Sequence, residues 1–513
     1  MNIVGSNPTP KDTKAKSKMF GYFLLSTEIY IIIQVVFLLF FSIILQENIL
    51  NLKYKFNVLN LVQYFSCLTL LYAIIVLYKT INYEAILLNY QLICDNLSFF
   101  FKFVVLFMSF VCILFTWNYC EYENIKIFEY LLLLLLSIVG ILTIISSYDL
   151  ITMYLAIELQ SLCFYIITNL KFYSNFSIEA GLKYFILGAL SSGVLLFGSS
   201  LLYGFTGLTN FLDLTILFYY HTLEGYNLYY YEGALIGLIF IYCGILFKIG
   251  IVPFHMWVSD IYEGSPTNIT FFFAIVPQIS ILSLLLRLNI IFIYAYLKYL
   301  YIFFIILSIL TIIVGTLGAI YQIKLKRILA YSGISNMGYI LTAALTINIE
   351  SIYSIVFYII VYNMVTMGLW ILLLSFRNQS NLIKFKEIGD IVLLFNSNKY
   401  ISIIFFIFLF SAMGIPPMLG FFSKLFILLN IIELKMYFFS IFLIILNSIG
   451  VIYYLRFIKV MYFATSNKFL FLQNLSEIKA LFLIFLVYIN IFFFFFPNYV
   501  LLFIHNIILF IFS

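Results

Sequence analysis

Long apolar runs separated by short polar segments dominate this chain. Most runs hold about 20 residues, enough for a helix rising 1.5 Å per residue to cross roughly 30 Å of hydrocarbon. The pattern therefore predicts about fourteen helices, at 29–45, 58–78, 98–117, 128–147, 150–170, 182–205, 233–252, 268–287, 297–321, 328–347, 351–376, 400–432, 437–463 and 480–496. The final stretch, 500–512, is short for a span and is expected to lie at the membrane interface or along neighbouring helices.

Composition agrees with this pattern. Hydrophobic residues make up 65% of the chain and charged residues only 9%, too few to cover a water-soluble particle of 513 residues. The sequence therefore predicts an all-α integral membrane protein.

Glycine and proline interrupt two of the predicted helices, the seventh at 248–253 and the twelfth at 413–417. Proline removes a backbone donor and clashes with the preceding turn, so a helix is broken or unwound at such a point. Each break falls in the fourth helix of a five-helix group. Because five is odd, the second group would cross the membrane inverted relative to the first, as in ion-coupled transporters. Proline kinks without function are the simpler alternative.

This repeat divides the chain into four parts. Residues 1–127 hold an N-terminal tail and three helices, and 128–290 hold the first five-helix repeat. Residues 291–463 hold the second repeat, and 464–513 hold the last helix and a C-terminal tail.

Basic residues gather in the loops that follow odd-numbered helices. These are Lys53, Lys55, Lys126, Lys171, Lys324, Lys326, Arg327, Lys384, Lys386, Lys399, Lys468 and Lys479. By the positive-inside rule these loops face the cytoplasm or the mitochondrial matrix, and both termini face the other side. The basic leader 8–18 disagrees, but one solvated tail weighs less than many loops. The net charge of +6 is spread over loops, so no nucleic acid is expected as a partner.

Three charged residues, Glu158, Lys248 and Lys424, stand inside apolar runs. A charge at mid-membrane costs roughly 2.5 to 3.5 kcal/mol, which marks each as a candidate functional residue with a partner. A buried Glu and Lys pair can switch protonation, because moving one charge changes the proton affinity of the other. We expect the break beside Lys248 to offer its carbonyls to the ammonium. The alternatives are a structural hydrogen bond for Glu158 and anchoring of Lys424 at the interface near Glu433.

Other ionisable residues are weaker candidates. Lys183 fits either a buried pathway or a salt bridge on the loop side. Lys102 is expected to snorkel or to pair near an interface, two turns after Asp95, and Arg287 to act as an anchor. Asp149 can cap its helix or guard an entrance.

Nothing in the sequence favours a metal or redox centre in this chain. The six cysteines form no C-x-x-C pair and have no histidine beside them at ligand spacing. The histidines are His221, His255 and His505. We therefore expect no cofactor in this chain.

Five motifs carry a resemblance to a known family. They are SYDLITMYLAIELQSLCFYII, EAGLKYFILGALSSGVLLFGSSLLYGFTG, FKIGIVPFHMWVSDIYEGSPTNIT, KLKRILAYSGISNMGYIL and GIPPMLGFFSKLF. Together they resemble the antiporter-like subunit 2 of proton-pumping NADH:ubiquinone oxidoreductase, respiratory complex I, over residues 95–468. The ELQSL segment and the lysine on the twelfth helix favour subunit 2 over subunits 4 and 5.

The resemblance implies a non-redox subunit of the enzyme's membrane arm, which translocates protons driven by quinone reduction elsewhere in the complex. NADH, FMN, iron-sulfur clusters and ubiquinone would then bind partner subunits. The implied partners are another antiporter-like subunit, the small membrane subunits, and phospholipids including cardiolipin. Glu158, Lys248 and Lys424 match the family's charged residues on the fifth, seventh and twelfth helices.

Two positions depart from the family pattern. Gln278 stands where many relatives carry a lysine, and Asn336 where many carry a histidine. Glutamine can relay a proton through water but cannot hold it as a charged station. Either hydrated Gln278 suffices, or His255 or Lys326 compensates, or this copy pumps poorly.

The expected path begins on the matrix side near Lys326 and Lys183. It continues from Lys248 through Gln278 and water to Lys424, which releases protons toward the intermembrane space. A cation/proton antiporter or antiporter subunit would use the same fold and charges. A structural spacer with an inactive path is the second alternative, which Gln278 keeps open.

Residue usage bears on location. The chain has 60 Phe, 42 Tyr and only four arginines, with heavy use of Ile, Asn and Lys, as expected of an A+T-rich coding sequence. We therefore expect a mitochondrial gene and the mitochondrial inner membrane. An A+T-rich bacterium and its plasma membrane would give a similar profile.

Overall fold

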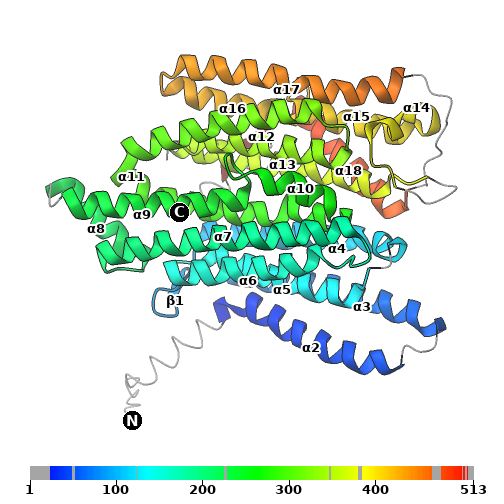
Figure 1. Cartoon of the computed structure of the whole chain (residues 1–513), viewed down its shortest axis with the longest axis horizontal. Helices are drawn as coiled ribbons and strands as arrows, with labels where there is room; N and C mark the ends of the chain where they lie inside the picture. The colour runs from blue at the N-terminus through cyan, green and yellow to red at the C-terminus, as the bar shows by residue number, and fades with distance from the viewer. Residues whose placement is uncertain are drawn as a thin grey trace, which may run out of the picture.

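Figure 1 shows the computed structural model of the chain, in which the helices lie side by side with a similar tilt. The structure describes residues 23–48, 52–81, 83–123, 125–224, 228–345, 348–378, 384–464, 475–499, 501–502 and 505–506. The basic leader 8–18 and most of 500–512 lie outside these ranges. The one sheet within the described ranges is a hairpin of β1 (Ala85–Leu87) and β2 (Leu92–Cys94).

The first five predicted helices are all present, as α2 (Ser26–Asn48), α3 (Leu52–Thr80), α4 (Asn96–Tyr122), α5 (Ile127–Ser146) and α6 (Leu150–Thr168). Polar caps set two of the helix starts. Asp95 and Ser98 form a capping box at α4, and Asp149 accepts the backbone N–H of Ile151 at α6. Asp149 therefore caps its helix, one of the two roles considered from the sequence.

The next segment contains α7 (Asn175–Thr206), α8 (Phe211–Glu224), α9 (Leu228–Ile249) and α10 (Met256–Gly264). The break predicted in the seventh helix is confirmed, since α9 ends at Ile249 and helix resumes only at Met256. Gly250 permits the break because its φ is +86°, in the region that favours glycine. The sequence pattern missed α8 because its 14 residues are too few for a span.

The eighth and ninth predicted spans are both present, but no break in the helix divides them. Helix α11 (Thr267–Tyr321) is continuous over 55 residues, because no glycine or proline lies at 288–298 to end it. Such a helix would be about 82 Å long if straight, well over the thickness of the hydrocarbon. It contains two windows long and apolar enough to span, Thr267–Phe292 and Tyr299–Tyr321.

The remainder of the chain forms α12 (Leu325–Ala343), α13 (Ile349–Ser375), η1 (Ile388–Ile391), α14 (Leu394–Ser397), α15 (Lys399–Met413), α16 (Leu419–Glu433), α17 (Tyr437–Phe463) and α18 (Glu477–Phe495). The second predicted break is also confirmed, between α15 and α16, where Gly414 has a φ of +78°.

Twelve segments of the described chain are long and apolar enough to cross a membrane. The two predicted spans without such a window are the polar α12 and the broken pair α15 and α16. The inverted relation between the two repeats and the four-part division remain predictions.

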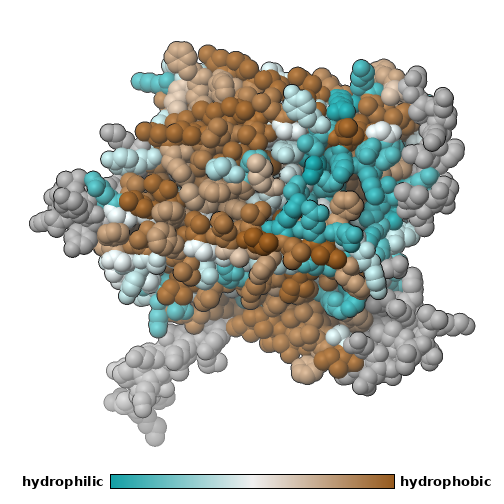
Figure 2. All heavy atoms as spheres, in the orientation of Figure 1, coloured by the Kyte–Doolittle hydropathy of each residue, from teal (hydrophilic) through white to brown (hydrophobic). Residues whose placement is uncertain are grey.

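The centre of the molecule is formed by α11 and α13. Within the window Thr267–Phe292 94% of residues are buried, compared with 28% in the window of α18 at the edge. Figure 1 places α2 and α3 at one edge and α16 and α17 at the other. Figure 2 shows a largely hydrophobic surface, with hydrophilic residues gathered toward the right of the view. Gln278 on α11 therefore lies in the most deeply buried layer.

Candidate functional site

Lys424 lies on α16 and its ammonium turns back into the break between α15 and α16. Its Nζ donates to the carbonyl oxygens of Ala412 (3.2 Å) and Met413 (2.9 Å) and to Oδ1 of Asn447 (2.7 Å). The last carbonyls of a helix have no partner within it, so the end of α15 supplies acceptors for a cation. The ammonium also lies 5.5 Å from the ring centre of Tyr339. Anchoring at the interface near Glu433 is therefore wrong.

Lys248 lies in the last turn of α9, beside the other break. Its Nζ is buried and has no hydrogen-bond partner within the described part of the chain. The expectation that the break would offer its carbonyls to Lys248 is wrong, and two of these carbonyls bind other groups. The Phe247 oxygen accepts the indole N–H of Trp257 at 2.9 Å, and the Leu246 oxygen accepts the N–H groups of Gly250 and Ile251.

Glu158 lies midway along α6 and is partly buried. Ser161 Oγ donates to its Oε2 at 3.1 Å. Its carboxylate acts electrostatically on Lys248, but no direct ion pair joins the two side chains in the described structure. The two side chains therefore interact electrostatically without a direct contact.

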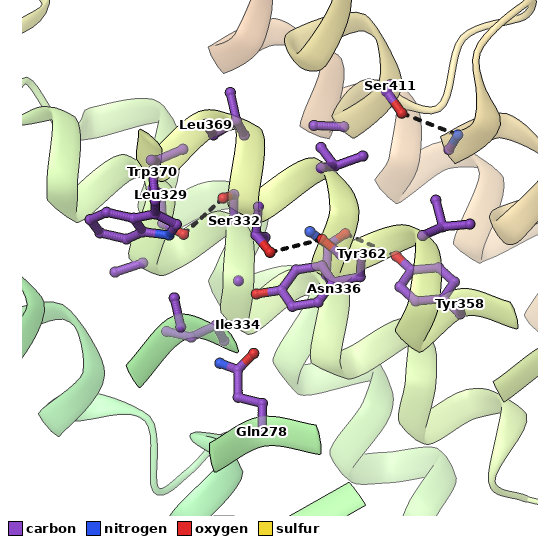
Figure 3. Close-up of a pocket in the computed structure, with 18 of the residues that line it drawn as sticks. Gln278, Leu329, Ser332, Ile334, Asn336, Tyr358, Tyr362, Leu369, Trp370 and Ser411 are labelled. Atoms are coloured by element: carbon purple, nitrogen blue, oxygen red, sulfur yellow. Dashed lines mark hydrogen bonds between the residues drawn. The ribbon is translucent and has the colours of Figure 1, made fainter. Parts of the chain in front are cut away.

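A cavity of about 40 Å³ is lined by both Gln278 and Lys424. Figure 3 shows part of this lining, including Gln278, Asn336 and Tyr358. Since a water molecule needs roughly 10–15 Å³ on this measure, the cavity has room for about two to four. Its polar lining comprises Tyr262, Gln278, Ser332, Asn336, Tyr358, Tyr362, Thr366, Ser411, Ser423, Lys424 and Tyr454. Ile249, the neighbour of Lys248, also lines it. The structure thus places Gln278 and Lys424 on one polar cavity and Lys248 next to it.

Tyrosines lie around Gln278, the uncharged position between Lys248 and Lys424 in the expected path. The sequence did not predict them as site residues. Tyr262 and Tyr362 lie within hydrogen-bonding reach of the Gln278 side chain, whose Oε1 accepts no hydrogen bond from the described residues. Tyr358 donates its hydroxyl to Asn336 Oδ1 at 2.9 Å, as Figure 3 shows. With 42 tyrosines in the chain, no local signal distinguishes these three.

The weaker candidates lie away from this cavity. Lys183 pairs with Glu179 (2.7 Å) and Asp260 (3.2 Å) and is 43% exposed, which matches the loop-side salt bridge. Lys326 donates to the Ser265 carbonyl at 2.6 Å. His255 is buried beside the first break, and its Nδ1 has no partner among the residues described.

A cluster of ion pairs joins several loops at the end of the helices. Glu123, just after α4, binds Arg377 (2.9 Å), Lys384 (2.9 Å) and Lys171. Although burial raises the pKa of the Glu123 carboxyl, Lys384 and Lys171 lower it more strongly, to about 2. The guanidinium of Arg377 also lies 5.0 Å from the ring centre of Tyr119. Two of the basic loops predicted to share one side, those of Lys171 and Lys384, therefore meet at Glu123.

Two further ion pairs correct the sequence reading near the N-terminus. Lys102 is only 1% exposed and binds Glu28 on α2 at 2.5 Å, so of its two predicted roles it forms an ion pair and does not snorkel. Asp95 instead binds Arg287 of α11 at 2.9 Å, and Arg287 is 6% exposed, which excludes a simple surface anchor. Within the described ranges, no group of three or more His, Cys, Asp or Glu residues is placed to hold a metal ion.

Comparison with known proteins agrees with this arrangement. Residues 147–450 match the family described as NADH:quinone oxidoreductase/Mrp antiporter, TM. NADH-ubiquinone oxidoreductase chain 2 of Marchantia polymorpha is 42% identical over 411 residues, 80% of this chain and 82% of the relative. NADH-quinone oxidoreductase subunit N of Pelagibacter ubique (strain HTCC1062) is 37% identical over 437 residues, 85% of this chain and 88% of the relative.

Two solved structures share the fold. A chain of respiratory complex I from Thermus thermophilus with bound aureothin matches with a TM-score of 0.74 and 22% identity, over 93% of this chain and 98% of that one. A chain of the Mrp complex from Dietzia sp. DQ12-45-1b gives 0.75 and 16%, over 94% and 96%. The matched region covers both breaks and every lining residue of the central cavity except Tyr454. This chain therefore belongs to the NADH:quinone oxidoreductase/Mrp antiporter family, as do relatives named NADH-ubiquinone oxidoreductase chain 2 and NADH-quinone oxidoreductase subunit N.

Proposed function

We propose that this chain is a membrane-arm subunit of NADH:ubiquinone oxidoreductase and carries protons across the membrane without a redox centre of its own. The names and similarity of the relatives support the assignment to this enzyme. The observation that carries the proton function is the polar cavity, with room for water, between Gln278 and the buried ammonium of Lys424.

Lys424 is the station with the best-defined geometry. Its three oxygen acceptors suit an ammonium, because NH₃⁺ has three protons to donate. A neutral amine has only two and would leave one acceptor unpaired. Loss of the proton from Lys424 would therefore weaken the contact between α16 and the end of α15 and couple protonation to the geometry of the break.

Lys248 is the station that responds to its surroundings. With no hydrogen bond to hold its charge within the described structure, its protonation depends on the distance to Glu158. A shift of α6 toward α9 favours the ammonium, and a shift away favours release of the proton.

The gap at Gln278 is crossed by water and hydroxyl groups. Tyrosine hydroxyls donate and accept hydrogen bonds, as water does, so together they form a chain along which protons hop without a charged station. Tyr262 and Tyr362 beside Gln278 begin this chain, and Tyr358 with Asn336 extends it toward Lys424.

The remaining parts of the proposal follow from the family. Protons would enter at the basic end near Lys183 and Lys326 and leave on the other side from Lys424. Quinone reduction in partner subunits, which would hold NADH, FMN, iron-sulfur clusters and ubiquinone, would drive the transfer. The partners would be other membrane-arm subunits, including a second antiporter-like one, and phospholipids. The location would be the mitochondrial inner membrane.

The test is proton pumping by the assembled complex in liposomes. Lys248→Gln and Glu158→Gln should each lower the protons moved per NADH oxidised or the coupled turnover, whereas Lys459→Gln, an exposed lysine on α17, should not. Unchanged stoichiometry and turnover in both variants would favour a structural spacer. Cation-driven proton exchange by the chain alone in liposomes would favour the antiporter alternative.

A further inference from the structure

A second and larger cavity lies at the end of the helices where the basic loops meet. Its volume is about 240 Å³, compared with about 40 Å³ for the central cavity. Its charged lining residues are Lys171, Lys324, Lys326, Lys384, Lys386, Glu263 and Glu387. The lining thus holds five lysines and two glutamates.

Salt bridges engage three of the five lysines. Lys324 binds Glu263, and both Lys171 and Lys384 bind Glu123. The acidic groups are shared further, because Glu263 also binds Arg327. Glu123 and Glu263 are thus already occupied by cations, and Glu387, the other carboxylate of the lining, accepts the backbone N–H of Asp390.

The other two lysines have no carboxylate partner in the described part of the chain. The Lys326 ammonium donates to the neutral carbonyl of Ser265 at 2.6 Å. Lys386 is exposed, and its backbone N–H, not its ammonium, contacts Asp390. A cavity with two such ammonium groups favours an anion.

A buried hydroxyl in the same lining independently points to a ligand. Thr267 is 6% exposed, and its Oγ1 has no hydrogen-bond partner within the ranges described. It is the first residue of α11, whose N-terminal end carries partial positive charge. An anion with several oxygens would satisfy the hydroxyl and the two ammonium groups together, as phosphate groups do.

The surroundings place this cavity at the level of lipid headgroups. Phe176, part of the lining, is 69% exposed, and nearby Tyr173 is 86% exposed, as aromatic residues are at membrane interfaces. From there α7 presents exposed apolar residues along its length, among them Leu182, Ile186 and Leu190. A molecule held by its phosphate in the cavity would find an apolar surface for its acyl chains, which a soluble phosphate compound or an acidic peptide would not use.

We propose that this cavity binds the phosphate of an anionic phospholipid, held by the ammonium groups of Lys326 and Lys386 and the hydroxyl of Thr267, with the acyl chains lying along α7. The site is separate from the central cavity, and it shares Lys326 with the proposed entry point for protons.

The test uses the assembled complex in phosphatidylcholine vesicles that contain a phosphatidylglycerol with a photoreactive diazirine in one acyl chain. Labelling of the α7 peptide is measured by mass spectrometry. Lys386→Gln should lower it about fivefold, the effect of one lysine near an anionic lipid. Thr267→Val should also lower it, and Lys386→Arg should preserve it. Lys399→Gln is the matched control, because Lys399 is an exposed lysine outside the cavity lining. Lys326 is left unchanged because it belongs to the proposed proton uptake.

Competition identifies the source of the phosphate. Unlabelled phosphatidylglycerol should compete, whereas phosphatidylcholine and inorganic phosphate at equal concentration should not. Equal competition by inorganic phosphate would overturn the assignment to a lipid in favour of a soluble anion. Equal labelling of the α7 peptide in all variants would also overturn it.

Discussion

The ammonium of Lys424 donates a 2.9 Å hydrogen bond to the carbonyl oxygen of Met413, the last residue of α15. The broken helix thus contributes its own terminus as an acceptor for the charge on the following helix. At the other break the equivalent carbonyls bind Trp257 and the backbone, and Lys248 is left without a hydrogen bond in the described structure. The lysine beside one break is therefore hydrogen-bonded by helix-end carbonyls, whereas the lysine beside the other break is not.

Replacing Asn447 tests how Lys424 holds its charge. Asn447→Leu removes an acceptor at 2.7 Å and should destabilise the ammonium by about 1.5 to 3 kcal/mol, as for other hydrogen bonds to charged groups. We expect proton pumping by the complex to fall by about one to two powers of ten if this step limits turnover. Ser448→Ala, on the outer side of the same turn, is the control and should pump normally.

The tyrosine chain predicts a rescue. Tyr362→Phe removes a hydroxyl beside Gln278 and should slow pumping about tenfold or more, while Tyr400→Phe, on the surface, should not. Adding Gln278→Lys to Tyr362→Phe supplies a protonatable group at the gap and should restore much of the rate. Pumping in liposomes is the measurement, and equal loss in the single and double variants would contradict a role in transfer.

The break between α15 and α16 depends on a close approach at Gly420. A Cβ added there would lie 1.8 Å from the carbonyl oxygen of Ser411, so Gly420→Ala must push the two helices apart. We expect less assembled complex and a lower melting temperature. Gly193→Ala, where no atom lies within 4 Å of the added Cβ, should be neutral or stabilising by about 0.5 to 1 kcal/mol.

Removing one partner of the buried ion pair of Glu28 and Lys102 should destabilise the protein more than removing both. Lys102→Met leaves an unpaired carboxylate in an apolar setting and should destabilise the N-terminal helices by about 3 to 5 kcal/mol. Adding Glu28→Leu removes that charge, so the double variant should be more stable than the single one. Thermal unfolding of the complex provides the comparison, and additive losses would argue against the pairing.

Glu123 predicts a specific dependence on pH. Its pKa is lowered from an ordinary 4.5 to about 2, so the stability it contributes is fully present above about pH 4.5 and is lost as the pH falls toward 2. The difference in melting temperature between the wild type and Glu123→Gln should therefore stay constant from about pH 5 to 8. Glu129→Gln should change stability little, because the pair of Lys126 and Glu129 is exposed.

Much of the helical plan could be read from local sequence. Apolar runs located the spans, and the Gly and Pro residues at 248–253 and 413–417 located both breaks. The reading went wrong where the local signal was weak. No glycine or proline at 288–298 marks the end of one helix or the start of the next. Helix α8 is apolar but too short to give a spanning pattern.

The sequence by itself determined which residues are unusual in a membrane. Glu158, Lys248 and Lys424 are visible because each is a charge inside an apolar run, and Gln278 because it departs from a recognisable pattern. Only the tertiary structure decided what each of them faces. Lys102 finds Glu28 at a sequence separation of 74 residues, and Lys424 finds Asn447 on the next helix. Such partners depend on which helix faces pack together, and spacing along the chain does not record this.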